Sequence, residues 1–227
     1  MTFPPRAPQS LTDRDDIVAN DWAAYSALRD LVDHWARPAW PDGASAYYWL
    51  LDLGDQLSLR QYAHKLQEGL HDDPDLSLVP LDLLHMTMLR VGEVDAVRVR
   101  ELAALAANAD SRLAGTGAIR LVAVPLAGSP GAIRFSVTPW DRLLDVVERL
   151  GSAAEAVLGQ TAVSQLRPHI SIAYNGRPRA AQPLIETIHA LRDPGASIEL
   201  TVTRVRLVRL CRLGRQYSWT TKHTIGL

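Results

Sequence analysis

Two stretches of this sequence decide the fold: residues 83–89, LLHMTML, and residues 166–173, LRPHISIA. Each is a short apolar run that follows a turn-like or proline-containing stretch, which is typical of a β-strand. Each also carries a histidine, His85 or His169, followed two residues later by a hydroxyl side chain. Because alternate side chains of a strand point to the same face, each stretch presents an imidazole beside a hydroxyl.

The two pairs are His85 with Thr87 and His169 with Ser171. If the strands face one another, they supply one acid, one base and two hydroxyl donors around a small anion. Imidazole suits either role near neutral pH because its ordinary pKa is about 6.5. This set of groups can break a phosphodiester bond with no metal and no other cofactor. A hydroxyl two residues after a histidine is common by chance, so the apolar flanks carry the inference.

On these motifs the chain resembles the 2H phosphoesterase superfamily, specifically its 2′-5′ RNA ligase-like and RNA 2′,3′-cyclic phosphodiesterase branch. The pattern there is His-x-Thr/Ser, twice, with hydrophobic neighbours. The resemblance covers roughly residues 45–227, and it implies a bilobal α+β fold with pseudo-two-fold symmetry and one motif per lobe. It also implies that His85 and His169 are catalytic and that Thr87 and Ser171 bind the substrate phosphate.

Composition indicates an ordinary globular protein. With 227 residues, 47% hydrophobic content and a formal net charge of −1, the chain can bury one core or two small lobes that share one. No apolar run approaches the ~20 residues of a membrane helix, and residues 1–8 lack the apolar core of a signal peptide. We therefore expect a cytoplasmic location and no membrane partner. The single Cys211 excludes an intramolecular disulfide, and the spacing of the remaining histidines predicts no metal site.

Residues 1–44 form an N-terminal extension to this core, with an amphipathic helix predicted over residues 12–36. Thr12 or Asp13 is placed to cap that helix. Its apolar residues recur at spacings of three and four: Trp22, Tyr25, Leu28, Leu31, Val32 and Trp35. We expect the helix to pack on the main body, and a lid or a dimer contact is the alternative.

The rest of the chain alternates strands and helices. Strands are predicted over residues 46–53, 76–79, 83–91, 118–126, 132–138, 167–174, 198–210 and 216–222. Helices are predicted over residues 58–71, 95–108, 140–158 and 183–191. Each half reads strand, helix, motif strand, helix, strand, which predicts two antiparallel sheets with outer helices around a central cleft.

Further side chains are candidates for binding the substrate. Arg134 follows a Gly-Pro turn and Arg167 precedes His169 by two residues, so both are candidates for phosphate binding. By strand parity Arg90 and Tyr174 fall on the opposite face from their motif histidines, unless a β-bulge intervenes. Three aromatic residues are candidates for stacking on a base, although burial is the commoner outcome: Tyr174, Tyr217 and Trp219.

Positive charge is concentrated near the end of the chain. Residues 167–227 hold nine arginines and one lysine against three acidic residues, a local net charge of +7. The densest cluster is Arg204, Arg206, Arg209, Arg212 and Arg215. Such a stripe either attracts phosphates or is a solvated strand face, and the pattern alone leaves both interpretations open.

These observations favour a metal-independent phosphodiesterase that hydrolyses a 2′,3′-cyclic phosphate. The partner expected is an RNA 3′ end or a small nucleotide substrate. No glycine-rich phosphate loop occurs, which argues against ATP-dependent ligation or kinase chemistry. Three alternatives stay open: chemistry on 2′-5′ linkages, a non-catalytic module that binds an RNA end or a nucleotide, and a partner-binding protein centred on the N-terminal helix. The sequence does not assign acid and base between the two histidines.

Overall fold

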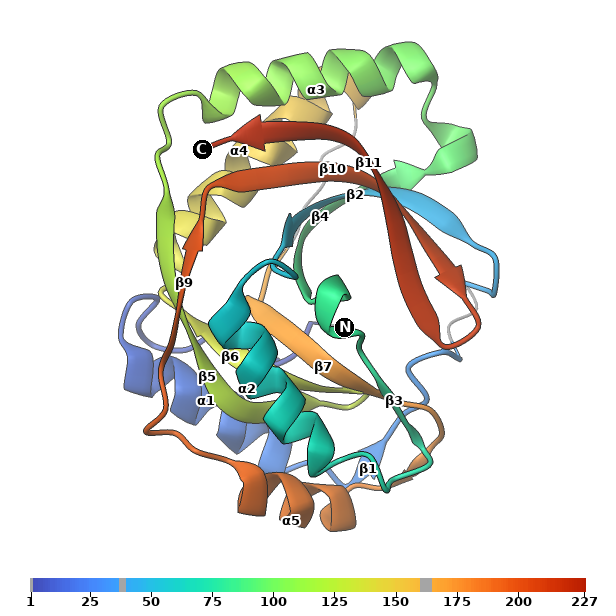
Figure 1. Ribbon diagram of the computed structural model, residues 1–227. Coiled ribbons are helices and arrows are strands. Elements are labelled where there is room, and N and C mark those ends of the chain that lie inside the picture. Colours follow the sequence, from blue (N-terminus) through green and yellow to red (C-terminus); the bar gives the residue numbers. More distant parts are fainter. Residues whose placement is uncertain (1, 37–39, 160–164) are drawn as a thin grey trace.

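The computed structural model describes residues 2–36, 40–159 and 165–227, where five α-helices pack against two main β-sheets (Figure 1). The helices are α1 (Arg14–Ser26), α2 (Leu57–Glu68), α3 (Val99–Leu113), α4 (Asp141–Leu158) and α5 (Gln182–Leu191), with 3₁₀ helices at Leu81–Leu83 and Val94–Ala96. The strands are β1 (Asp30–Leu31), β2 (Ser45–Asp52), β3 (Leu76–Leu78), β4 (His85–Glu93), β5 (Ile119–Ser129), β6 (Ala132–Thr138), β7 (His169–Asn175), β8 (Arg179–Ala180), β9 (Ile198–Val202), β10 (Arg204–Leu213) and β11 (Gln216–Gly226).

Each motif strand lies in a different sheet. β4, which begins at His85, is the edge of a four-stranded sheet in the order β11-β10-β2-β4. β7, which begins at His169, lies inside a five-stranded sheet in the order β3-β7-β6-β5-β9, and the pairings in both sheets are antiparallel. In Figure 1 the four-stranded sheet lies above the five-stranded sheet, with α3 across the top and α5 along the bottom. The predicted α+β fold is confirmed, and Trp49 and Phe135 belong to one buried cluster that the two lobes share.

The two sheets do not correspond to the two halves of the sequence. β3 precedes the first motif but pairs with β7, while β10 follows the second motif but pairs with β2. The prediction of one continuous strand over residues 198–210 is wrong, because two strands, β9 and β10, form there. β9 pairs with β5 in one sheet, and after Thr203 the chain continues as β10 in the other sheet. The chain therefore crosses between the lobes at this point and ties them together.

Helix α4 shows why elements form where local pattern predicts them. Its buried side chains lie three or four residues apart, so they form one apolar stripe against the core: Leu143, Val146, Val147, Leu150, Ala153 and Ala154. The helix ends at Gly159, whose φ of 65° is left-handed and whose amide donates to the Glu155 carbonyl at 2.9 Å. Glycine adopts this conformation without a steric penalty, so the chain terminates the helix where the sequence predicts.

The N-terminal helix is shorter than predicted. Asp13 caps α1 and accepts from the Asp16 amide at 2.8 Å, but the helix ends at Ser26 and not near residue 36. Beyond it the chain is extended, and the Val32 amide donates to the Pro130 carbonyl at 2.8 Å. The short strand β1 pairs with β8. Backbone hydrogen bonds to distant segments therefore override a helical periodicity that continues through residue 35.

Candidate active site

The two motifs line one cleft between the sheets. The cleft has a volume of about 1140 Å³, and its walls include His85 and Thr87 from β4 and His169 and Ser171 from β7. The structure therefore brings together all four residues that the sequence pairs. A cleft of this size is large enough for a small organic ligand.

The two histidines are held in the same way. Nδ1 of His85 lies 2.8 Å from the carbonyl oxygen of Leu83, and Nδ1 of His169 lies 2.7 Å from that of Arg167. Since a carbonyl oxygen only accepts, Nδ1 carries the proton and donates in both rings. This bond to the residue two positions earlier fixes the ring orientation and leaves Nε2 as the nitrogen available for chemistry.

The surroundings of the two rings differ in charge. Burial lowers the pKa of His85 below its usual value, while the hydrogen bond to Leu83 and the nearby Asp52 carboxylate oppose that change. Burial lowers the pKa of His169 to about 3, with the Arg134 guanidinium as the next contributor. The pseudo-symmetric pair is therefore electrostatically asymmetric, and the charged form is favoured at His85 over His169.

The two hydroxyls remain available to a ligand. Ser171 is buried and Thr87 is half-buried, and both line the cleft. Within the described ranges of the chain neither hydroxyl has a protein hydrogen-bond partner. A hydroxyl in this situation can donate to an oxygen of a bound anion.

Each motif strand carries a β-bulge directly after its hydroxyl. The ladder between β2 and β4 skips Met88, and the ladder between β6 and β7 skips Ile172. An extra residue reverses strand parity, so Arg90 and Tyr174 lie on the cleft face with the motif residues. The exception that the sequence analysis made for a β-bulge therefore applies to both residues, and neither lies on the opposite face.

The two candidate arginines also line the cleft. Arg134 lies opposite Ser171 in the β6–β7 ladder and is only 2% exposed. The Arg167 guanidinium is 5.9 Å from the centre of the Trp140 ring. With Arg90, three positively charged side chains therefore line the cleft that holds both histidines.

A family model described as the 2′-5′ RNA ligase superfamily matches residues 55–212, a range that includes both motifs. The chain belongs to this superfamily. Membership supports phosphodiesterase-type activity in general, and it leaves open the choice between hydrolysis of cyclic phosphates and ligation. No curated protein matches the chain in sequence.

Several solved structures have the same fold as this chain, although their sequence identity to it is low. TT0787 of Thermus thermophilus is 18% identical with a TM-score of 0.62, and the match covers 80% of this chain and 97% of TT0787. LigT of E. coli in its apo form is 16% identical with a TM-score of 0.60, covering 82% and 99%. LigT complexed with 3′-AMP is 17% identical with a TM-score of 0.59, with the same coverage.

Residues 1–54 lie outside the range that matches the superfamily model, yet several of them line the cleft. Phe3 and His34 are two cleft residues that the sequence analysis did not identify. It predicted that His34 lies in a helix, which the structure does not show. The His34 ring stacks on Tyr174 with centroids 4.0 Å apart, and its Nε2 lies 2.9 Å from the Tyr217 hydroxyl. Trp219, also a stacking candidate, instead packs edge-on against His85 at 5.1 Å.

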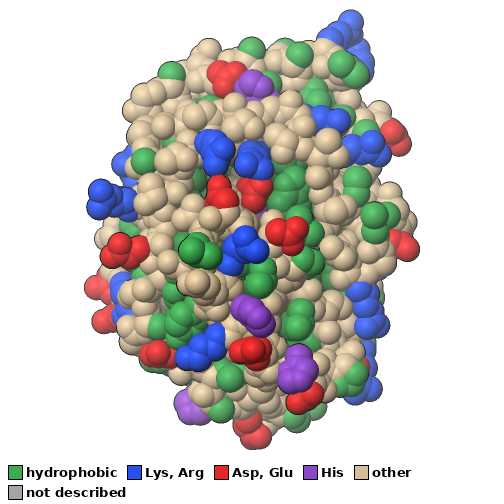
Figure 2. Space-filling view, in the orientation of Figure 1, with side chains coloured by type: hydrophobic (Ala, Val, Ile, Leu, Met, Phe, Trp, Pro, Cys, Tyr) green, Lys and Arg blue, Asp and Glu red, His purple; other side chains and the backbone are tan. Residues whose placement is uncertain are grey.

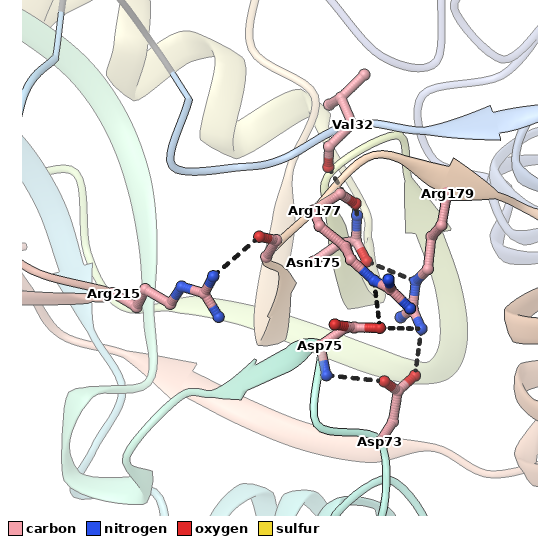
Figure 3. A network of polar contacts seen from close by, with 8 residues as sticks. Val32, Asp73, Asp75, Asn175, Arg177, Arg179 and Arg215 are labelled. Carbon is pink, nitrogen blue, oxygen red and sulfur yellow. Dashed lines mark hydrogen bonds and ion pairs between the residues drawn. The ribbon is translucent and has the colours of Figure 1, made fainter.

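A polar network surrounds the end of β7, and Figure 3 shows its labelled residues: Val32, Asp73, Asp75, Asn175, Arg177, Arg179 and Arg215. Arg179 Nη1 lies 2.7 Å from Asp73 Oδ2, and the Asn175 amide group donates to the Val32 carbonyl at 2.8 Å. Arg215 from the β10–β11 hairpin donates to the Gly176 carbonyl at 3.1 Å. The end of β7 is therefore bound to three segments that are far apart in the sequence.

Most of the arginine cluster near the C-terminus is engaged by other groups of the protein. Arg204 pairs with Asp55 at 3.0 Å, and Arg206 pairs with Asp52. Arg212 donates to the Trp40 carbonyl at 2.7 Å. Figure 2 shows basic and acidic side chains intermixed on the visible face, without a broad field of one sign. The structure thus favours a solvated strand face over a phosphate-attracting stripe.

The described residues contain no group of three or more His, Cys, Asp or Glu side chains placed to hold a metal ion. None of their helices combines the length and the apolar character that a membrane crossing needs.

Proposed function

We propose that this protein is a metal-independent phosphodiesterase that hydrolyses 2′,3′-cyclic phosphates on RNA ends or nucleotides. The observation that carries the proposal is the shared geometry of His85 and His169. Two imidazoles in one cleft, each bound through Nδ1 to a backbone carbonyl, present two Nε2 atoms for proton transfer. General acid–base catalysis needs this pair of positioned groups.

We infer the roles of the two rings from the charges around them. Neutral His169, beside Arg134, takes a proton from water as the water oxygen attacks phosphorus. One phosphorus–ribose oxygen bond of the cyclic phosphate breaks, and His85, beside Asp52, gives its proton to the leaving ribose oxygen. The products are a ring-opened phosphate monoester and a free hydroxyl, and one proton transfer between the histidines restores the starting state.

The other cleft residues would hold the phosphate. Thr87 and Ser171 line the cleft from opposite lobes, and we expect both to donate to non-bridging oxygens of the phosphate. Arg90, Arg134 and Arg167 supply positive charge where negative charge develops in the transition state. Positioning from both sides keeps the attacking water in line with the leaving oxygen.

The ligands bound to a structural relative support a phosphate-bearing nucleotide as the ligand of this protein. LigT of E. coli has crystal structures complexed with 3′-AMP, ATP and phosphate. Because LigT in these complexes is 17% identical to this chain, they support the class of ligand and not a particular binding mode.

The test is hydrolysis in the presence of EDTA of 2′,3′-cyclic mononucleotides and of an oligonucleotide ending in a 2′,3′-cyclic phosphate. We expect turnover by the wild type and a loss of about 10²–10⁴-fold in kcat/KM for His85→Ala and for His169→Ala. His64, exposed on α2, is the matched control, and His64→Ala should retain activity. Binding without turnover would instead indicate a non-catalytic module, and cleavage restricted to 2′-5′ linkages would indicate the other enzymatic alternative.

A further inference from the structure

Helix α1 packs on the same face of the five-stranded sheet as the catalytic cleft. Ser136 lies opposite His169 in the β6–β7 ladder, and Arg134 lies opposite Ser171. Alternate residues of a strand share a face, so Ser136 and Arg134 point the same way. The side chain that meets both of them comes from Asp21 of α1.

Asp21 is a buried carboxylate, 1% exposed, whereas Asp15 on the same helix is exposed. Its Oδ2 accepts a hydrogen bond from the Ser136 hydroxyl at 2.6 Å, and its Oδ1 lies 3.6 Å from Arg134 Nη2. Burial raises the pKa of Asp21, and Arg134, Ser136 and Arg167 act against that rise. The carboxylate therefore interacts electrostatically with both candidate phosphate-binding arginines, Arg134 on β6 and Arg167 before β7.

This ion pair is incompletely satisfied. At 3.6 Å Asp21 and Arg134 attract each other without a direct hydrogen bond, and Asp21 Oδ1 and Arg134 Nε are buried without a partner among the described residues. Arg134 Nη2 is shared with the Phe3 carbonyl at 3.3 Å. A pair kept only for stability is expected to use its donors and acceptors fully, because unpaired buried polar atoms are costly. A guanidinium with spare donors beside a cleft is instead suited to an anionic ligand.

We propose that Asp21 is a positioning residue of this cleft, which acts through Arg134 and Ser136 to hold the anion-binding side formed by the second motif. The N-terminal segment then contributes to anion binding, although it lies outside the range that matches the superfamily model. The inference rests on the proposed function only in requiring a phosphate group as ligand. The charged and titratable groups that face Arg134 and His169 are Asp21 from α1, Arg167 before β7 and His85 from β4.

The test is the affinity for inorganic phosphate, measured by calorimetry on the full chain, because phosphate binding is independent of turnover. We expect Asp21→Asn to weaken phosphate binding about tenfold, as the loss of one charge-assisted contact would. Asp15→Asn is the matched control, since Asp15 is an exposed carboxylate on the same helix. It should bind phosphate as the wild type does.

A second pair of variants keeps the test decisive if Asp21→Asn fails to fold. Ser136→Ala preserves both charges and removes only the hydroxyl that orients Asp21, while Ser136→Thr restores a hydroxyl. We expect weaker phosphate binding in Ser136→Ala, recovery in Ser136→Thr, and in a working enzyme an effect on KM larger than that on kcat.

The outcomes separate this inference from the proposed function. Phosphate binding that depends on Asp21 and Ser136 in a protein without cyclic phosphodiesterase activity would overturn only the proposed function. Wild-type phosphate affinity in folded Asp21→Asn and Ser136→Ala would overturn the positioning role, and so would a wild type that does not bind phosphate.

Discussion

Asp52 lies directly opposite His85 in the β2–β4 ladder, whereas the residue opposite His169 in the β6–β7 ladder is the uncharged Ser136. The two motifs share their histidine geometry but not this neighbour. A carboxylate beside one imidazole and a guanidinium beside the other favour opposite protonation states. The ladder register thus distinguishes two nearly identical motifs, and it supports the proposal that His85 is the acid.

The first prediction concerns Asp52→Asn. Without the carboxylate the pKa of His85 falls further, so less of the protonated acid is present at a given pH. We expect the alkaline limb of the kcat/KM profile to move to lower pH and activity at neutral pH to fall. The measurement is kcat/KM for a 2′,3′-cyclic mononucleotide against pH.

The matched control for that profile is Asp55→Asn. Asp55 is a nearby carboxylate that pairs with Arg204 and does not lie opposite either histidine. Its replacement should leave the alkaline limb in place. An unchanged profile for Asp52→Asn would argue that His85 is not the acid.

A second prediction links His169 to the pH dependence of stability. The pKa of His169 is about 3 in the folded protein, below its ordinary value of 6.5. Between these values the unfolded chain binds a proton that the folded chain does not, so stability is lost as the pH falls from about 6.5 towards 3. The slope from this group is at most about 1.4 kcal/mol per pH unit.

The check is the free energy of unfolding by urea at several pH values for the wild type and for His169→Gln. The variant should show a shallower loss of stability on the acid side, because glutamine does not titrate. His64→Gln, which changes an exposed histidine, should retain the wild-type slope. Parallel curves for wild type and His169→Gln would contradict the assignment of a depressed pKa.

The sequence predicts those parts of the site whose pattern lies within a few adjacent residues. The motif strands were predictable because alternation around His85 and His169 is a property of a few adjacent residues. Helix α4 was predictable for the same reason. The end of α1 was not, because residues 27–35 keep a helical spacing but are held extended by hydrogen bonds to Pro130 and Asn175.

Other parts of the site have no pattern in the neighbouring sequence that predicts them. Nothing in the sequence around Met88 or Ile172 marks a bulge, yet these two residues decide that Arg90 and Tyr174 enter the cleft. Asp21 reads as one more acid of an N-terminal helix, and only the packing of α1 on β5 and β6 buries it. Bulges and buried partners come from tertiary packing, which the pattern of one segment does not encode.

The third prediction tests the bulge after Thr87. Since the bulge at Met88 brings Arg90 into the cleft, Arg90→Ala should weaken phosphate binding and raise KM about tenfold. A group that holds the phosphate equally in the ground and transition states changes KM more than kcat. Steady-state kinetics on a 2′,3′-cyclic mononucleotide would measure both, with Arg100→Ala on helix α3 as control. A KM equal to that of the wild type would place Arg90 outside the binding site.

The last prediction concerns the contact that seats α1 on the sheet. A Cβ added at Gly128 of β5 would lie 2.3 Å from Cε2 of Tyr25, one helical turn after Asp21. The buried ring has no room to accept this atom, so Gly128→Ala should displace α1. We expect a loss of about 1–3 kcal/mol in stability, the usual cost of overpacking, together with weaker phosphate binding as Asp21 moves away from Arg134.

Thermal unfolding and phosphate calorimetry on the same samples measure the two effects. The matched control is Gly226→Ala, because a Cβ at Gly226 would meet nothing within 4 Å. If Gly128→Ala lost stability but bound phosphate as tightly as the wild type, α1 would stabilise the fold without influencing the cleft. If it lost both while Gly226→Ala lost neither, the seating of α1 and the state of Arg134 would be coupled, as the contacts of Asp21 require.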